Sequence, residues 1–113
     1  MKWSIRFLGI ALVTATAATA QAEGFAIAGA GSMSCGKFLQ ADRDRDNVTS
    51  LVVVTWAQGY LSGVNTQRYA MTKQDMAIQP DGESIRAYIL KHCTDNPLHT
   101  VYEAAIHLSS EMK

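Results

Sequence analysis

The two cysteines, Cys35 and Cys93, are the residues of this 113-residue sequence whose chemistry is most informative. An even cysteine count in a short exported chain is typical of a structural disulfide. A bond between them would close a loop of nearly 60 residues, which is worth about 4 kcal/mol in the chain-entropy model. The alternative is two free thiols in a reactive or metal-binding site. It is less favoured because the cysteines lack C-x-x-C spacing and the nearest other ligand, His92, is adjacent to Cys93.

His99, Glu103 and His107 are the strongest candidates for metal ligands. Their spacing of four residues would place all three on one face of a predicted C-terminal helix. Neighbouring members could share a zinc ion, but all three could not, because eight residues of helix span about 12 Å. We favour a solvent-exposed face in which Glu103 pairs with a charged histidine, and we predict no metal ion and no cofactor. A pH-sensing role also stays open, because imidazole titrates near pH ~6.5.

Sequence signatures of enzymes are missing from the chain. It has no Gly-x-Ser-x-Gly motif around a nucleophilic serine, no phosphate-binding loop and no dinucleotide fingerprint. The glycine-bounded segment 59–63 is not followed by Lys and then Ser or Thr, as a phosphate-binding loop would be. We therefore predict a protein that is not an enzyme.

Residues 1–22 have the three zones of a secretory signal peptide. Lys2 and Arg6 give a positive start, an apolar stretch of about a dozen residues follows, and residues 20–22 (Ala-Gln-Ala) supply the cleavage pattern. Cleavage would leave Glu23 at the start of an exported, periplasmic chain. A membrane-spanning helix needs about 20 apolar residues, so we expect no membrane span in the mature chain. An uncleaved N-terminal anchor helix is the alternative.

The mature chain is small and weakly acidic. Residues 23–113 hold eight Lys and Arg against ten Asp and Glu, a net charge of −2 with neutral histidines. This charge gives no basic surface for nucleic acid. We expect a flexible leader over residues 23–33 and a single helical domain over residues 34–113. A chain of this size buries only ~60–65% of its unfolded surface, so its core is marginal and a disulfide contributes a large share of its stability.

Helical spacing predicts an all-α fold, a small bundle of three to four helices held by one disulfide. The longest predicted helix, about 48–65, has a predicted core stripe at helical intervals, although its β-branched run 52–55 favours a strand locally. This stripe consists of Val53, Trp56, Ala57, Tyr60 and Val64. A shorter helix precedes this helix and two follow it, the last of them starting at Asn96 and Pro97. The expected bounds of these three are Cys35 to about Asp42 with Ser34 as its cap, about Glu83 to Thr94, and about Pro97 to Glu111 with Leu98 facing the core. The apolar stripe of the second of these helices is Ile85, Tyr88, Ile89 and Cys93.

Three large side chains, Trp56, Tyr60 and Leu61, lie close together around Gly59 and Gly63 of the long helix, and we expect these glycines to allow the close approach of another backbone. At helical spacing such a cluster is more often core than interface. A marginal domain of this size also gains stability from a partner or a second copy, so we retain these three residues as a candidate surface for a client or partner protein, and a homodimer as a candidate assembly.

Three segments of the sequence together resemble the HdeA/HdeB family of periplasmic acid-stress chaperones. They are residues 35–39 (Cys-Gly-Lys-Phe-Leu), 56–63 (Trp-Ala-Gln-Gly-Tyr-Leu-Ser-Gly) and 88–97 (Tyr-Ile-Leu-Lys-His-Cys-Thr-Asp-Asn-Pro). The resemblance extends over about residues 35–102. It implies an all-α fold, a bridge between Cys35 and Cys93, and dimers that change state in acid to bind unfolding client proteins.

A second resemblance leads to a different function. The Gly-Tyr-Leu-x-Gly segment at 59–63 and the amphipathic C-terminal helix after Pro97 are similar to small periplasmic immunity proteins of the Tai type. This resemblance implies an inhibitor that binds one specific effector at neutral pH.

Acid chemistry favours the chaperone hypothesis. Near pH 2 the carboxylates are neutral and the three histidines charged, so residues 23–113 would carry about +11 from side chains. Such a change adds self-repulsion that can split a dimer or loosen the fold. We therefore expect a small periplasmic protein that loosens in acid and binds unfolding proteins, with an immunity or inhibitor protein as the alternative.

Overall fold

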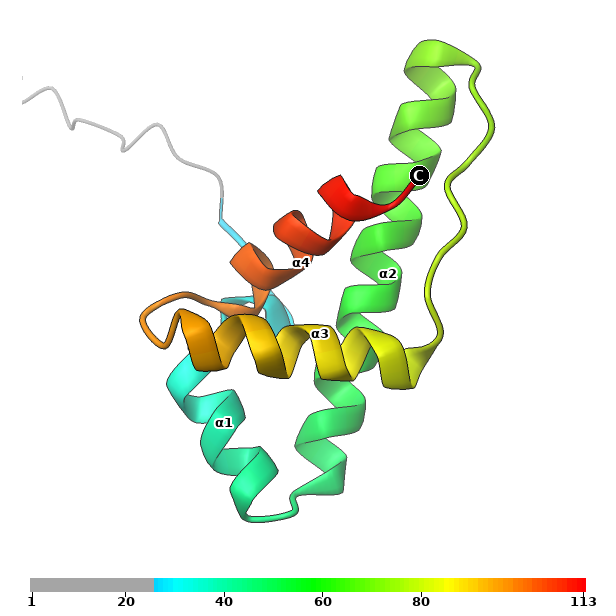
Figure 1. Ribbon diagram of the computed structural model, residues 1–113. Helices are drawn as coiled ribbons and strands as arrows, with labels where there is room; N and C mark the ends of the chain where they lie inside the picture. The colour runs from blue at the N-terminus through cyan, green and yellow to red at the C-terminus, as the bar shows by residue number, and fades with distance from the viewer. Residues whose placement is uncertain (1–25) are drawn as a thin grey trace, which may run out of the picture.

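The computed structural model describes residues 26–113, and within this range the chain forms four α-helices and one short 3-10 helix (Figure 1). The predicted all-α fold is confirmed, since no strand occurs in this range apart from an isolated bridge between Ser34 and Thr100. The predicted signal peptide lies outside the described residues. The elements are η1 (Gly29–Ser32), α1 (Cys35–Arg43), α2 (Asn47–Thr72), α3 (Gly82–Asp95) and α4 (Val101–Glu111).

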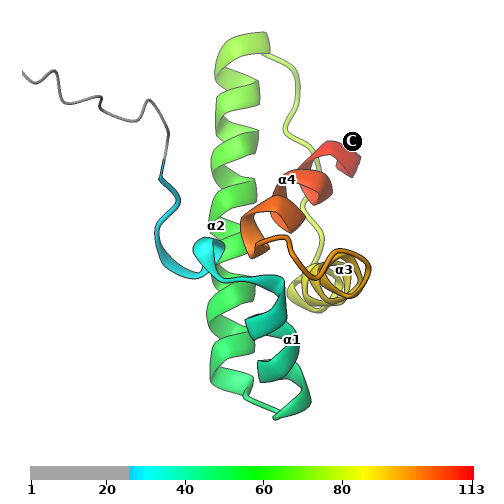
Figure 2. The same ribbon diagram turned by 90° about the vertical axis from the view of Figure 1, so that its left-hand side faces the viewer.

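Helix α2 is the longest element, and the other three α-helices lie on one side of it (Figure 2). Figure 1 shows α3 crossing α2, with α1 and α4 on opposite sides of α3. None of the helices in residues 26–113 combines the length and apolar character that a membrane crossing requires.

Every α-helix begins at a polar side chain that accepts a backbone N–H of the first turn. Ser34 caps α1 as predicted, and Asp81 caps α3 by accepting from the N–H of Ser84. Helix α2 begins one residue earlier than expected, with Asp46 as its cap. These side chains satisfy backbone donors that the helix itself leaves without partners.

Helix α2 extends to Thr72, about two turns beyond the predicted end, and then the chain returns along it in an extended segment (Figure 1). The buried amide of Asn65 holds this segment. It donates to the carbonyl of Ala77 at 2.9 Å and accepts the N–H of Ala77 at 3.2 Å. The extra turns lack an apolar stripe, and Tyr69 and Met71 are exposed on them, which explains why periodicity did not reveal them.

The predicted start of the last helix at Asn96 and Pro97 is wrong. Helix α4 begins at Val101, where Thr100 and Glu103 form a capping box in which each side chain bonds the other's backbone N–H. The chain ahead of it is held extended, because His99 accepts the N–H of Cys35 at 2.8 Å and the N–H of Val101 donates to Met33 at 2.9 Å. Leu98, predicted to face the core, is therefore 96% exposed.

The predicted disulfide is present, and the structure excludes two free thiols. Cys35 in the first turn of α1 is bonded to Cys93 in the last turn of α3, with Cα atoms 4.9 Å apart. Both cysteines are fully buried in one apolar cluster to which all four helices contribute. Its largest fully buried members besides the cysteines are Phe38, Val53, Leu61, Ile85, Ile89 and Val101.

Replacing Asn65 with alanine should lower the free energy of unfolding by about 1–3 kcal/mol, because it leaves the buried N–H and C=O of Ala77 without partners. Chemical denaturation at pH 7 would measure the change. Thr66→Ala, at the neighbouring exposed position, is the matched control and should have a smaller effect. Equal stabilities of the two variants would contradict the role given to the Asn65 amide.

Candidate functional site

Trp56, the first residue of the predicted client surface, is half-buried beneath the N-terminal 3-10 helix. Its indole Nε1–H donates to the carbonyl of Ala28 at 3.0 Å. Gly31 lies directly against the ring, where a Cβ atom would be 2.1 Å from Cζ2 of Trp56. Residues 29–33 had been expected in a flexible leader. They instead fold onto Trp56, and this close approach requires a glycine at position 31.

Trp56, Tyr60 and Tyr102 form a cluster of three aromatic rings between α2 and α4. Trp56 and Tyr60 are stacked at 5.5 Å between centroids with 7° between their planes. Tyr102 of α4 meets Tyr60 edge-on at 5.5 Å and Trp56 at 6.5 Å. Burial, with a smaller effect of Tyr102, raises the pKa of Tyr60. Helix α4 therefore covers the two aromatic residues that the sequence singled out.

Leu61, the third residue of the predicted surface, lies on a different face of α2. Its side chain is fully buried in the core. The structure thus brings Trp56 and Tyr60 together and separates Leu61 from them. All three could meet a client only after the helices around α2 have loosened.

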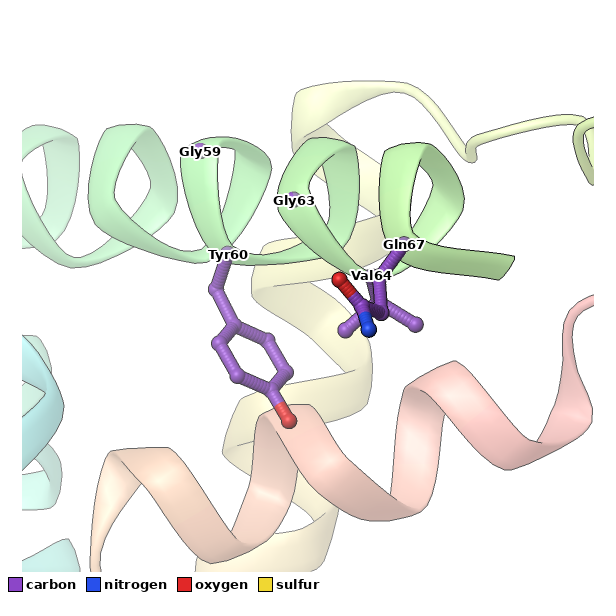
Figure 3. Close-up of a pocket in the computed structure, with 5 residues that line it drawn as sticks. All are labelled: Gly59, Tyr60, Gly63, Val64 and Gln67. Carbon is purple, nitrogen blue, oxygen red and sulfur yellow. The ribbon is translucent and has the colours of Figure 1, made fainter. Parts of the chain in front are cut away.

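A shallow groove of about 420 Å³ runs along α2 beside the aromatic cluster. Figure 3 shows the side chains of Tyr60, Val64 and Gln67 on the side of α2 that faces α4. Gly59 and Gly63 complete the lining of the groove and contribute only backbone from α2. A Cβ atom at either glycine would meet nothing within 4 Å. The prediction that these glycines allow a close backbone approach is therefore wrong within the described chain, where they border open space.

An exposed apolar face on the first turns of α2 was not singled out by the sequence. Val48, Leu51 and Val52 are 73%, 66% and 50% exposed. They are spaced as neighbours on one helical face. The signal was in the sequence as three apolar residues at i, i+3 and i+4, but the predicted core stripe started only at Val53.

The three histidines lie together where α3 meets α4. The ring of His92 is 5.2 Å from that of His99 and 5.0 Å from that of His107 between centroids, and His99 and His107 are 6.5 Å apart. Because His99 precedes α4, the predicted single helical face of His99, Glu103 and His107 does not exist. His92 was missed as a member because it lies on another helix. Within residues 26–113, no group of His, Cys, Asp or Glu side chains is arranged to hold a metal ion.

Local contacts set the charge of this histidine cluster. Burial lowers the pKa of His92, and the neighbouring His107 and His99 lower it further, against smaller opposing effects of Glu103 and Asp95. The backbone N–H of Thr100 lowers the pKa of Glu103, which it donates to at 2.7 Å. At neutral pH the cluster therefore combines neutral His92 with a charged Glu103.

Two carboxylates tie α3 to its neighbouring helices. Arg86 of α3 forms a salt bridge with Asp42 of α1 and donates to Ser50 of α2 at 2.9 Å. Tyr88 donates its hydroxyl proton to Glu111 of α4 at 2.9 Å. Burial and this bond raise the pKa of Tyr88 to about 12. The contacts between helices thus depend in part on carboxylate groups.

Comparison with known proteins gave one match. No curated protein and no solved structure matched the chain. A model of the HdeA/HdeB family matches residues 4–103, which is most of the sequence and includes both cysteines, Trp56 and the five-residue connection between α3 and α4. The chain therefore belongs to the HdeA/HdeB family.

Proposed function

We propose that this protein is a non-enzymatic periplasmic chaperone of acid stress, which loosens at low pH and binds unfolding proteins. Family membership supports this kind of role. The observation that carries the proposal for this chain is that three of the four α-helices in residues 26–113 use a carboxylate to cap their first turn, namely Asp46 for α2, Asp81 for α3 and Glu103 in the capping box of α4.

Each of these carboxylates has its pKa lowered by the cap that it forms. For Asp46 the main cause is the Thr49 hydroxyl, for Asp81 it is the backbone N–H of Ser84, and for Glu103 it is that of Thr100. A folded-state pKa below the unfolded value of about 3.9–4.3 stabilises the fold at higher pH. This stabilisation is lost as the pH falls through the lowered pKa.

Acid also weakens the contacts between helices. Protonation of Asp42 removes the charge that pairs with Arg86, and protonation of Glu111 weakens it as an acceptor for Tyr88. At the same time the side chains of residues 23–113 approach a net charge of +11. Loss of the caps, weakening of these ties and self-repulsion therefore all act in the same direction when the chain is acidified.

Loosening would expose apolar surface while the chain stays compact. Separation of α4 from α2 uncovers Trp56 and Tyr60, and further opening uncovers Leu61. The Cys35–Cys93 bridge keeps α1 joined to α3 throughout. The exposed apolar face at Val48, Leu51 and Val52 would add to the client surface, and in a neutral-pH homodimer it would offer an area for a second copy to cover.

Neutral caps should make the fold more resistant to acid. The variant D46N/D81N/E103Q retains polar cap residues, and asparagine caps a helix about as well as aspartate, but it removes three titrating groups. The midpoint of acid unfolding, followed by circular dichroism at 222 nm, should therefore move to lower pH. Asp75→Asn, in the exposed segment between α2 and α3, is the control and should leave the midpoint in place. An unchanged midpoint in the triple variant would contradict the role of the caps.

The protein should suppress aggregation of a model client at pH 2–3 and not at pH 7. Trp56→Ala should raise the concentration needed for half-maximal protection by about tenfold, as loss of ~1.4 kcal/mol of binding would. Tyr69→Ala removes an exposed aromatic residue of the same helix and should have a smaller effect. Light scattering of the client measures both.

Absence of protection by the unmodified protein at pH 2–3 would end the chaperone proposal. A stable one-to-one partner captured from periplasm at pH 7 would instead favour the alternative of an inhibitor or immunity protein.

A further inference from the structure

All three histidines of the chain meet at the junction between α3 and α4. His92 comes from the last turn of α3, His99 from the connecting turn and His107 from α4. The closest contact is between Nε2 of His92 and Nδ1 of His99, at 3.0 Å. His107 is exposed, whereas the other two are half-buried. The junction therefore contains one imidazole pair in direct contact and a third imidazole beside it.

The backbone holds the His92–His99 pair in place. His92 adjoins Cys93 of the disulfide, and the carbonyl of His99 accepts the N–H of Cys35, the other half of the bridge, at 2.8 Å. The N–H of His99 donates to the carbonyl of Asn96 at 3.0 Å. The two rings cannot move apart without a change in their side-chain rotamers or in the connecting turn.

A hydrogen bond between two imidazoles needs one donor nitrogen and one acceptor nitrogen. It forms when both rings are neutral, or when one is charged and the other neutral. When both rings are protonated, all their nitrogens are donors, and two N–H groups face each other at the contact. The contact therefore tolerates one added proton and is broken by the second, which couples the two titrations.

The carboxylates around the His92–His99 pair offset the cost of protonating it only in part. Glu103 of α4 and Asp95 of α3 favour protonation of His92, but Asp95 is bound by Lys91 at 2.6 Å and Glu103 by the N–H of Thr100 at 2.7 Å. Glu111 of α4 lines the same pocket as His92 and accepts from Tyr88. All three carboxylates thus have other partners. Burial opposes protonation of His92 most strongly, and His107 adds to this effect, so that the pKa of His92 is lowered.

Helix α4 connects this junction to the aromatic cluster. Tyr102, five residues before His107 on α4, packs edge-on against Trp56 and Tyr60. Loss of the contact between His92 and His99 therefore loosens the anchor of the helix that covers the candidate client surface.

We propose that His92, His99 and His107 form a latch between α3 and α4, which opens at mildly acidic pH and begins to uncover Trp56 before the carboxylate caps titrate. This inference rests on the proposed chaperone function, in which it sets an earlier threshold. Because the folded protein favours neutral His92, the latch stabilises the fold fully above the unfolded histidine pKa of about 6.5. This contribution is lost as the pH falls through the lowered folded value.

The test uses the oxidised mature chain, residues 23–113, in which Trp56 is the single tryptophan. Its emission spectrum is recorded from pH 7.5 to pH 2. Two transitions are expected, one between the histidine and carboxylate ranges and a larger one below it. His99→Gln keeps the backbone bonds of residue 99 and should remove the upper transition while leaving the lower one in place.

The matched control restores the number of histidines without restoring the pair. In the variant H99Q/Q74H the third histidine lies in the exposed segment between α2 and α3, and the upper transition should stay absent. His107→Gln, at an exposed position, removes one charge that repels the protonated pair. Protonation of the pair then destabilises the closed junction less at each pH, so the upper transition should move to lower pH. It also provides a second test if His99→Gln does not fold at pH 7.5.

A single transition in the unmodified chain, or an upper transition that survives in H99Q/Q74H, would overturn the latch. Client protection at pH 2–3 is measured on the same samples. Protection that persists in chains without the upper transition refutes only the latch, whereas an upper transition without any protection refutes only the chaperone function.

Discussion

The bond between Cys35 and Cys93 is the constraint on which the remaining contacts depend. It joins the first turn of α1 to the last turn of α3, two helices that are separated in sequence by the whole of α2. Two backbone hydrogen bonds lie beside this disulfide. The N–H of Cys35 donates to the carbonyl of His99, and the N–H of Val101 donates to the carbonyl of Met33. A marginal core closed in this way needs less apolar area than an open chain, which leaves surface free for other uses.

The contacts that hold the fold together are of two kinds, those that protonation alters and those that it leaves unchanged. The disulfide and the apolar core carry no titrating group, whereas helix starts and several ties between helices use carboxylates. Lowering the pH would therefore weaken the caps and the ties between helices and leave the Cys35–Cys93 bond intact. A chaperone that must expose apolar surface and still recover its fold needs this division.

Much of the fold could be predicted from the sequence, because capping residues and apolar stripes within each helix indicate it locally. Ser34 identified the start of α1, and the stripe of Ile85, Ile89 and Cys93 identified the buried face of α3. The start of α4 was mispredicted because Asn96 and Pro97 form a good local start signal that backbone bonds from distant residues override. The order in residues 29–32 was missed because a Gly- and Ala-rich segment resembles a flexible leader until the ring of Trp56 is placed against Gly31.

The candidate site was predictable only in part, for the same reason. Trp56 and Tyr60 share a helical face, so their proximity follows from spacing, but the covering residue Tyr102 comes from another helix. The histidine cluster needs α3, a turn and α4 to be in place before its members meet. Tertiary contacts of this kind leave no periodic trace in one sequence.

The return segment after α2 has a consequence for the acid-loosened state that we propose. It is held by amides, through Asn65 to Ala77 and through Gln79, which donates to the carbonyl of Gln58 at 3.1 Å. Amide groups do not change their charge between neutral and acid conditions. Helix α2 and the return segment can therefore remain in contact when the carboxylate contacts are lost. They would then serve as a preformed nucleus from which the native fold re-forms on neutralisation.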